Sequence, residues 1–298
     1  MAIDRLVELA RFRNELIPQM LADGTFYTPV NPDKTQESRE RFGEFFSGFV
    51  VEGSHNLEAV RGLLATNQFI FAGNHIKELD IIARKIALEA TGFKHLTDNT
   101  VYPVELKWAE DPLLKYWMDA DHTVYTIPPN DLRDLDEGLK SEGLYESDLV
   151  ILRQYKTNCN NLTRAAVAKL GELRRAEDGD GPKILGLYPE TDFQRDGYIR
   201  RAPAGVSMLF SRHEGEYTVP ILTTGPELLT SLTEPMEVSQ RPQVRVRVGN
   251  RYPSKEVWDK RQKEVVEPVD LVMASIAKLD SSRIHPNFIS FYAPLIGS

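Results

Sequence analysis

The chain has a single cysteine and lacks any long apolar run. Cys159 has no second cysteine with which to form an intramolecular disulfide or a zinc site. The longest apolar stretches, such as residues 69–73, are far shorter than the roughly 20 residues that cross a bilayer, and charges interrupt the first twenty residues, where a signal peptide would be apolar. We therefore expect a cytoplasmic protein that contacts lipid, if at all, only at a membrane surface.

Positive charges are fewer than negative ones. The chain has 36 Lys and Arg residues and 44 Asp and Glu residues, which gives a net charge of -8. Because affinity for a phosphate backbone needs a dense cationic surface, this balance argues against a nucleic-acid partner. With 41% hydrophobic and 27% charged residues, the composition is that of an ordinary globular protein.

Helical periodicity begins at the N-terminus. A helix is expected over residues 3–22 and a second over 37–46, after a polar loop at 31–34, so we predict a helical extension over 1–46 and one α/β domain over 47–298. The first helix would either pack on the core or lie on a membrane, and its mixed charge favours packing. Its expected apolar positions are Leu6, Leu9, Phe12, Leu16 and Met20.

Strands and helices then alternate, which predicts a mostly parallel central sheet flanked by helices. The expected strands are 49–51, 68–72, 101–104, 123–127, 183–188, 217–222 and 243–248. The expected helices are 57–64, 78–91, 110–119, 160–176, 203–213 and 266–280. Residues 131–161 are rich in charge and have no clear periodicity. In such folds, sites gather where strands end and helices begin.

The segment from Gly73 to Asp80 stands at one such junction. His75 and Asp80 are five residues apart, so on one regular helix they would point about 140° away from each other. They can meet only if Gly73 and Asn74 form a turn and Asp80 reaches back from the first helical turn. An imidazole held by a carboxylate is a general base, whereas the alternative is a capping histidine followed by an aspartate that favours the helix dipole.

The sequence Asn74-His75-Ile76-Lys77-Glu78-Leu79-Asp80 resembles the Asn-His-x-x-x-x-Asp motif of the glycerolipid acyltransferases, and Glu78 is similar to a glutamate of their plastid-type members. Further segments follow in the family's order: 104–107 with 111–115, 123–128, Leu187-Tyr188-Pro189-Glu190, Ala204-Gly205-Val206 and Val219-Pro220-Ile221. The resemblance spans roughly residues 48–225, and the shared order is more specific than any single piece.

The resemblance implies transfer of a fatty acyl group from acyl-CoA or an acyl carrier protein to a hydroxyl of glycerol 3-phosphate, lysophosphatidate or a related acceptor. It implies no cofactor and no metal, with His75 and Asp80 as the catalytic pair. Residues expected to bind substrate are Asn74, Lys77, Glu78, Lys107, Pro189, Glu190, Thr191, Arg195, Arg200 and Arg201. A non-catalytic lipid-binding protein and a thioesterase on the same fold are the alternatives.

The chain departs from the family where the acceptor phosphate would bind. The family usually has Gly-Thr-Arg after its Pro-Glu, where this chain has Thr191-Asp192-Phe193, and its second motif commonly ends in Arg, where this chain has Pro128-Pro129. Arg195, Arg200 and Arg201 are near enough in sequence to replace these cations. The alternative is that Arg200 and Arg201 form only a solvated turn.

The strand expected at 243–248 alternates valines with Arg245 and Arg247. Such alternation is typical of a half-buried sheet edge. The other interpretation is a basic face on which an acidic acyl carrier protein docks.

Overall fold

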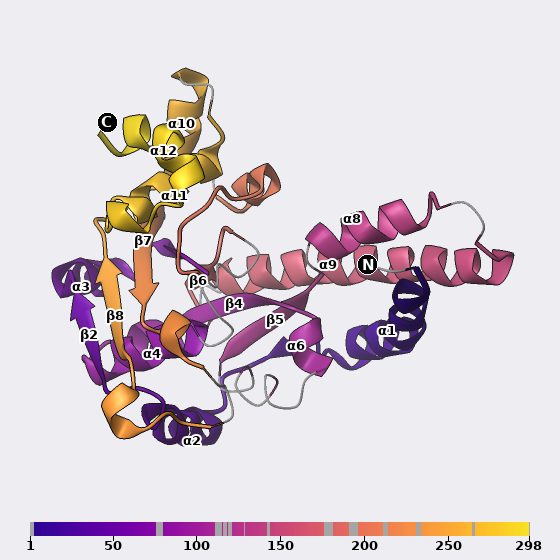
Figure 1. Cartoon of the computed structure of the whole chain (residues 1–298), viewed down its shortest axis with the longest axis horizontal. Helices are drawn as coiled ribbons and strands as arrows, with labels where there is room; N and C mark the ends of the chain where they lie inside the picture. Colours follow the sequence, from indigo (N-terminus) through magenta and orange to yellow (C-terminus); the bar gives the residue numbers. More distant parts are fainter. Residues whose placement is uncertain are drawn as a thin grey trace. The chain divides into compact units, whose positions relative to one another are not determined.

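The computed structural model describes residues 3–75, 80–110, 115, 118, 121–127, 129–141, 144–175, 181–190, 196–210, 214–230, 234–263 and 266–297 (Figure 1). The chain forms two compact units, Met1–Asn31 with Val101–Ala176 and Pro32–Thr100 with Glu177–Ser298. The predicted α/β class is confirmed, because helices alternate with mostly parallel strands and a helix precedes the first strand. The division into units differs from the expected boundary at residue 46.

The first unit combines four helices with three strands among the residues described. In it, β5 pairs in parallel with β4 and antiparallel with β1. The helix α1 packs along the long helix α9, and α8 packs on both (Figure 1). The elements are α1 (Ile3–Asp23), β1 (Tyr27–Thr28), β4 (Thr100–Glu105), α6 (Lys107–Glu110), β5 (His122–Thr126), α8 (Pro129–Gly138) and α9 (Glu146–Arg175).

The buried stripe of α1 differs from the expected one. Its buried positions are Leu6, Val7, Ala10, Arg13, Ile17 and Met20. Phe12, expected to be buried, is 53% exposed. The buried positions step by three and four residues only if Arg13 counts among them, and a charged residue was not expected there. Glu110, Asp131 and the Tyr155 hydroxyl all bond the Arg13 guanidinium, which makes its burial possible.

The second unit contains the strand that leads into the candidate site. The strands β6, β3 and β7 run parallel side by side, with β3 in the middle. Because β3 is covered on both faces, residues 69–73 are all buried, as the unbroken apolar run predicts. The strands are β2 (Gly48–Glu52), β3 (Gln68–Gly73), β6 (Ile184–Leu187), β7 (Glu216–Thr224), β8 (Gln243–Val248) and β9 (Tyr252–Pro253).

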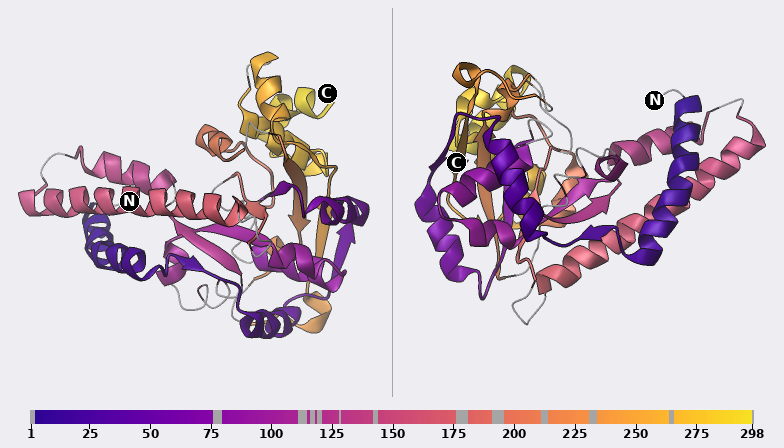
Figure 2. Two further views of the ribbon diagram at one scale, coloured as in Figure 1. Left: turned by 180° about the vertical axis from the view of Figure 1, so that it is seen from behind. Right: turned by 90° about the horizontal axis from the view of Figure 1, so that it is seen from below.

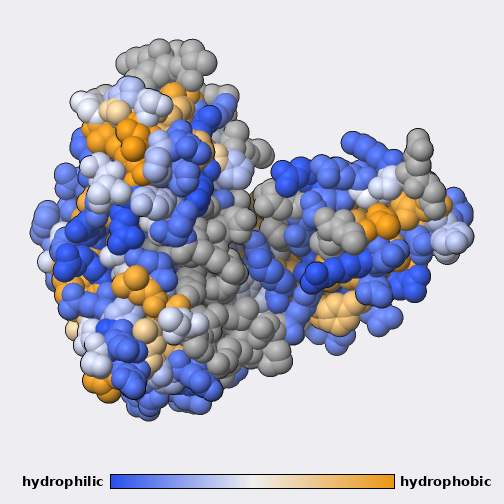
Figure 3. Space-filling view, in the orientation of Figure 1, coloured by the Kyte–Doolittle hydropathy of each residue, from blue (hydrophilic) through white to orange (hydrophobic). Residues whose placement is uncertain are grey.

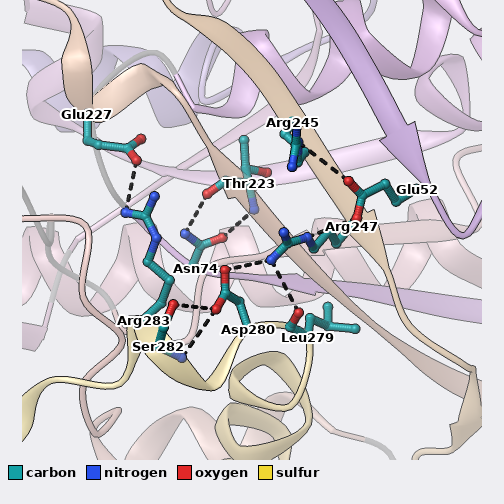
Figure 4. Close-up of polar contacts among 10 residues, drawn as sticks. All are labelled: Glu52, Asn74, Thr223, Glu227, Arg245, Arg247, Leu279, Asp280, Ser282 and Arg283. Atoms are coloured by element: carbon teal, nitrogen blue, oxygen red, sulfur yellow. Dashed lines mark hydrogen bonds and ion pairs between the residues drawn. The ribbon is translucent and has the colours of Figure 1, made fainter.

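The expectation that residues 243–248 form a sheet edge is wrong. The strand β8 lies between β7 and β2, pairing antiparallel with the first and parallel with the second. The valines are buried as the alternation predicts. Arg245 and Arg247 both form ion pairs with Glu52 of β2, at 3.4 and 2.9 Å (Figure 4). Their charge is therefore partly compensated within the sheet.

Helices alternate with these strands along the chain. Most of the expected helices are present, although several begin or end at other residues than expected. The helices of this unit are α2 (Pro32–Gly43), α3 (Ser54–Leu63), α4 (Asp80–Ala90), α5 (Lys94–Asp98), α10 (Glu256–Lys263), α11 (Pro268–Ala277) and α12 (Ile289–Gly297). The last three group together near the C-terminus, drawn in yellow in Figure 2.

Several element boundaries were misjudged from sequence. The polar loop expected at 31–34 is the start of α2, and the stretch 131–161 without clear periodicity contains most of α8 and the first half of α9. The helix expected at 203–213 is a 3-10 helix, Ala204–Leu209. The helix expected at 110–119 falls largely outside the described residues. No helix of the described part of the chain is long and apolar enough to span a membrane.

Candidate active site

The site lies where β3 ends and α4 begins, within the second unit. Asp80 is the first residue of α4, and its Oδ2 lies 3.0 Å from Nδ1 of His75. The two groups therefore meet across the bend, as the spacing predicts. Asp80 is completely buried, whereas the His75 side chain keeps 14% of its surface exposed. The carboxylate holds the proton on Nδ1, so Nε2 is the basic nitrogen of the neutral ring.

Asn74 connects the end of β3 to the end of β7. Its Nδ2 donates to the carbonyl oxygen of Thr223 at 2.9 Å, and its Oδ1 accepts from the Thr223 amide at 2.7 Å (Figure 4). Both polar groups of this buried side chain are thus used by the backbone of β7. Asn74 was expected to bind substrate, but these contacts make it a clamp that fixes the start of the His75 loop.

Glu190 anchors the same loop from the other side. Its Oε2 accepts the backbone amide of His75 at 2.8 Å, and its Oε1 accepts the amide of Arg200 at 2.9 Å. Burial raises the pKa of this carboxyl to about 7, and the two amides oppose that rise. Both carboxylate oxygens therefore hold backbone amides, and the predicted contact of Glu190 with substrate stays a prediction. Pro189 is buried beside it.

Arg200 and Arg201 are both engaged by acidic partners. Arg200 Nη1 lies 3.0 Å from Oδ1 of Asp196, and a second contact joins the same two side chains. Arg201 binds the fully buried carboxylate of Asp270 through two hydrogen bonds, 3.0 and 2.7 Å long. The guanidinium of Arg201 also lies 4.3 Å from the centroid of the Phe291 ring. Each arginine thus has a structural partner.

Of the remaining predicted site residues, the structure describes only Lys107. Lys77, Glu78, Thr191 and Arg195 lie outside the described residues. Lys107 begins α6 in the first unit, where its half-exposed ammonium pairs with Glu105. Their predicted contacts with substrate therefore stay predictions.

Two residues of the site were not singled out from the sequence. The ring of Tyr188 lies 4.7 Å from the ring of His75, measured between centroids. The Arg84 guanidinium lies over the same tyrosine ring, 4.6 Å from its centroid. The signal that could have found Arg84 is a pair of cations, Arg84 and Lys85, in the otherwise apolar run 81–88 of α4, with Arg84 four residues after Asp80.

The chemistry available here is proton transfer and binding of charge. Within the described ranges, no cluster of three or more His, Cys, Asp or Glu side chains is arranged to hold a metal ion. The dyad supplies a base with a fixed tautomer, and Arg84 supplies a buried positive charge nearby. A scan against models of protein families finds none that matches this sequence, and a search of curated proteins finds no similar sequence.

Proposed function

We propose that this protein is an acyltransferase that moves a fatty acyl group from a thioester to a hydroxyl. The observation that carries the proposal is the 3.0 Å contact between Nδ1 of His75 and Oδ2 of Asp80. The buried carboxylate orients the imidazole and stabilises it once it is protonated, so Nε2 acts as a general base. No protein nucleophile is needed, because the acceptor hydroxyl attacks.

The reaction balances with these groups alone. His75 Nε2 removes the proton of the acceptor hydroxyl while its oxygen bonds to the thioester carbonyl carbon. The tetrahedral intermediate then collapses, the carbon–sulfur bond breaks, and His75 passes its proton to the departing sulfur, so the products are the ester and the free thiol and the imidazole is neutral again. Backbone amides at the start of α4 are the proposed donors to the oxyanion; residues 78 and 79, which precede it, lie outside the described ranges.

The order of the sequence motifs supports the same proposal. The described segments that resemble the glycerolipid acyltransferases lie at the β3–α4 junction, at β4 and the start of α6, at β5, at the end of β6 and the turn after it, in the 3-10 helix Ala204–Leu209 and in β7. Acyl-CoA or an acyl carrier protein is the proposed donor, and a glycerol phosphate or a lysolipid is the proposed acceptor. A chance match of one motif would not reproduce the whole series.

Transfer assays with variants test the dyad. We expect His75→Ala to lower the rate about 10²- to 10⁴-fold, because the base is lost. Asp80→Asn should also lower it, since the amide fixes the wrong tautomer. His55→Ala is the matched control, because His55 is an exposed histidine of α3 in the same unit. Wild-type activity of His75→Ala would exclude the mechanism.

The substrates separate the alternatives. Labelled acyl-CoA is incubated with the wild-type protein, with and without glycerol 3-phosphate or lysophosphatidate. Label on the acceptor supports the proposal, whereas label only in free fatty acid indicates a thioesterase. Unchanged thioester in both arms, with an acyl carrier protein donor tested in parallel, indicates a non-catalytic lipid-binding protein.

Peripheral contact with a lipid surface is part of the proposal. Hydrophobic residues are exposed over the C-terminal helices (Figure 3), and Ile289 at the start of α12 is 52% exposed. Apolar side chains at a surface can enter the interface of a bilayer. Co-sedimentation with phosphatidylglycerol vesicles should fall on Ile289→Glu, while Val238→Glu, another exposed apolar position of this unit, is the control.

A further inference from the structure

Arg84 is a buried arginine beside the dyad. It lies on the second turn of α4, and only 1% of its surface is exposed. Its Nε donates to the Thr223 hydroxyl at 3.2 Å. Among the residues that the structure describes, its Nη1 and Nη2 atoms are buried and have no hydrogen-bond partner. Four of its five N–H groups are therefore unused.

Among the deeply buried arginines of the described residues, the lack of a counter-ion sets Arg84 apart from Arg13. Arg13, the other deeply buried one, has two carboxylates and a hydroxyl, and Arg201 has Asp270. Within the described residues no carboxylate lies at ion-pair distance from Arg84, although Asp80 is four residues earlier on the same helix. Burying an unpaired guanidinium costs several kcal/mol, and no described residue of the chain offsets that cost, so we look for the partner in a bound ligand.

The position of Arg84 is enforced by the backbone of the site. A Cβ at Gly73 would lie 2.0 Å from Nη2 and 2.6 Å from Nη1. Only glycine at position 73 therefore leaves room for the guanidinium at the end of β3. The bond to Thr223 holds Arg84 from β7, where Asn74 also attaches. The cation is thus built into the same junction that presents His75.

The distance to His75 suits a single small substrate. The His75 ring and the Arg84 guanidinium both contact Tyr188, at 4.7 and 4.6 Å from its ring centroid. Their separation cannot exceed the sum of these distances. A molecule that carries a hydroxyl near one end and a phosphate near the other is long enough to reach both groups.

We propose that Nη1 and Nη2 of Arg84 bind the phosphate monoester of the acyl acceptor, which places the acceptor hydroxyl at His75. The assignment rests on the proposed transfer reaction. A guanidinium fork matches two phosphate oxygens, and the bound dianion supplies the counter-charge that the site lacks. Arg200 and Arg201, two of the three cations expected from the sequence, already have carboxylate partners, and the third, Arg195, lies outside the described residues.

A binding experiment tests the site without relying on activity. The thermal unfolding midpoint is measured against inorganic phosphate at constant ionic strength. The wild-type midpoint should rise with phosphate, and this rise should be lost in Arg84→Met. The phosphate-free midpoint of Arg84→Met should be at least as high as that of the wild type, because an unpaired buried charge is removed. An unchanged phosphate response in Arg84→Met, or no response in the wild type, overturns the proposal.

Two further variants serve as controls for this experiment. Gly73→Ala keeps the charge but displaces the guanidinium, so the phosphate response should be lost here as well. Arg245→Gln removes an exposed arginine of β8 in the same unit and should keep the full response. Equal losses in Arg84→Met and Arg245→Gln would show only a general charge effect and would overturn the proposal.

The acceptor dependence of the reaction separates this proposal from the transfer reaction itself. Arg84→Met should raise KM for glycerol 3-phosphate by roughly 10-fold or more, the usual effect of losing a charged hydrogen bond, while KM for glycerol is unchanged. If Arg84→Met lowered kcat equally with both acceptors, Arg84 would act on the oxyanion of the tetrahedral intermediate, and the assignment to phosphate would be overturned. If the wild type transfers no acyl group, the proposed reaction fails, and the phosphate-binding experiment alone decides whether Arg84 is an anion site.

Discussion

Oε2 of Glu190 accepts the backbone amide of His75 at 2.8 Å, so the loop that carries the imidazole is fixed by a buried carboxylate from the end of β6. The other oxygen of the same carboxylate holds the amide of Arg200. Glu190 is therefore a positioning residue in the proposed mechanism, because it acts on substrate only through His75.

Glu190→Gln tests this positioning role. The glutamine side chain has one acceptor oxygen, whereas two backbone amides, those of His75 and Arg200, donate to Glu190. One of these two hydrogen bonds is therefore lost. We expect kcat to fall about 10- to 100-fold, since small misplacement of a base is costly, with little change in KM for the thioester. Steady-state kinetics measure both. Glu227→Gln is the matched control, because Glu227 is a partly buried glutamate that accepts the Gly225 amide and pairs with Arg283 (Figure 4).

The pKa of Glu190 predicts how stability varies with pH. Burial raises it from 4.5 to about 7 in the folded protein. Between these values the folded state binds more protons than the unfolded state, so the free energy of unfolding decreases as pH rises. The loss is complete above about pH 7 and amounts to up to about 3 kcal/mol. Urea unfolding at about pH 5 and about pH 8.5 should show a smaller pH dependence in Glu190→Gln than in the wild type.

Asn74→Ala should destabilise the second unit. The change removes the partners of the Thr223 amide and carbonyl, both at a buried position. Each unsatisfied buried group costs about 1–3 kcal/mol, and the His75 loop loses its link to β7. Chemical denaturation measures the loss. Asn56→Ala, which removes one bond to the Val248 carbonyl at 3.0 Å, should cost less; an equal cost would argue against the clamp.

Arg201→Met should lower stability without affecting phosphate binding. It leaves the fully buried carboxylate of Asp270 without its arginine, which costs about 3–5 kcal/mol when a pair is completely buried and less here because the guanidinium is partly exposed. The unfolding midpoint should therefore fall, whereas its rise with phosphate is retained. If Arg201→Met lost the phosphate response, the acceptor phosphate would bind at the arginines expected from the sequence and not at Arg84.

The sequence predicted the dyad geometry because the interaction is local. Five residues, with the end of β3 at Gly73 and the start of α4 at Asp80, are enough to bring Nδ1 of His75 to Asp80, although Gly73 belongs to the strand and not to the expected turn. The position of β8 could not be predicted, because alternating Val and Arg residues fit an edge strand and also an inner strand whose arginines pair with a neighbour. Which of these applies depends on Glu52, nearly two hundred residues earlier in the chain.

The α/β class, the order of most elements and the junction that carries His75 and Asp80 were determined by the sequence alone, through apolar periodicity and short-range motif spacing. Only the tertiary structure decided the roles of Asn74, Glu190 and Arg84. Their partners come from strands and loops far away in sequence: Asn74 and Thr223 are separated by 149 residues, His75 and Glu190 by 115. The partners of a polar side chain depend on such distant packing. The spacing of residues within one short segment does not encode it.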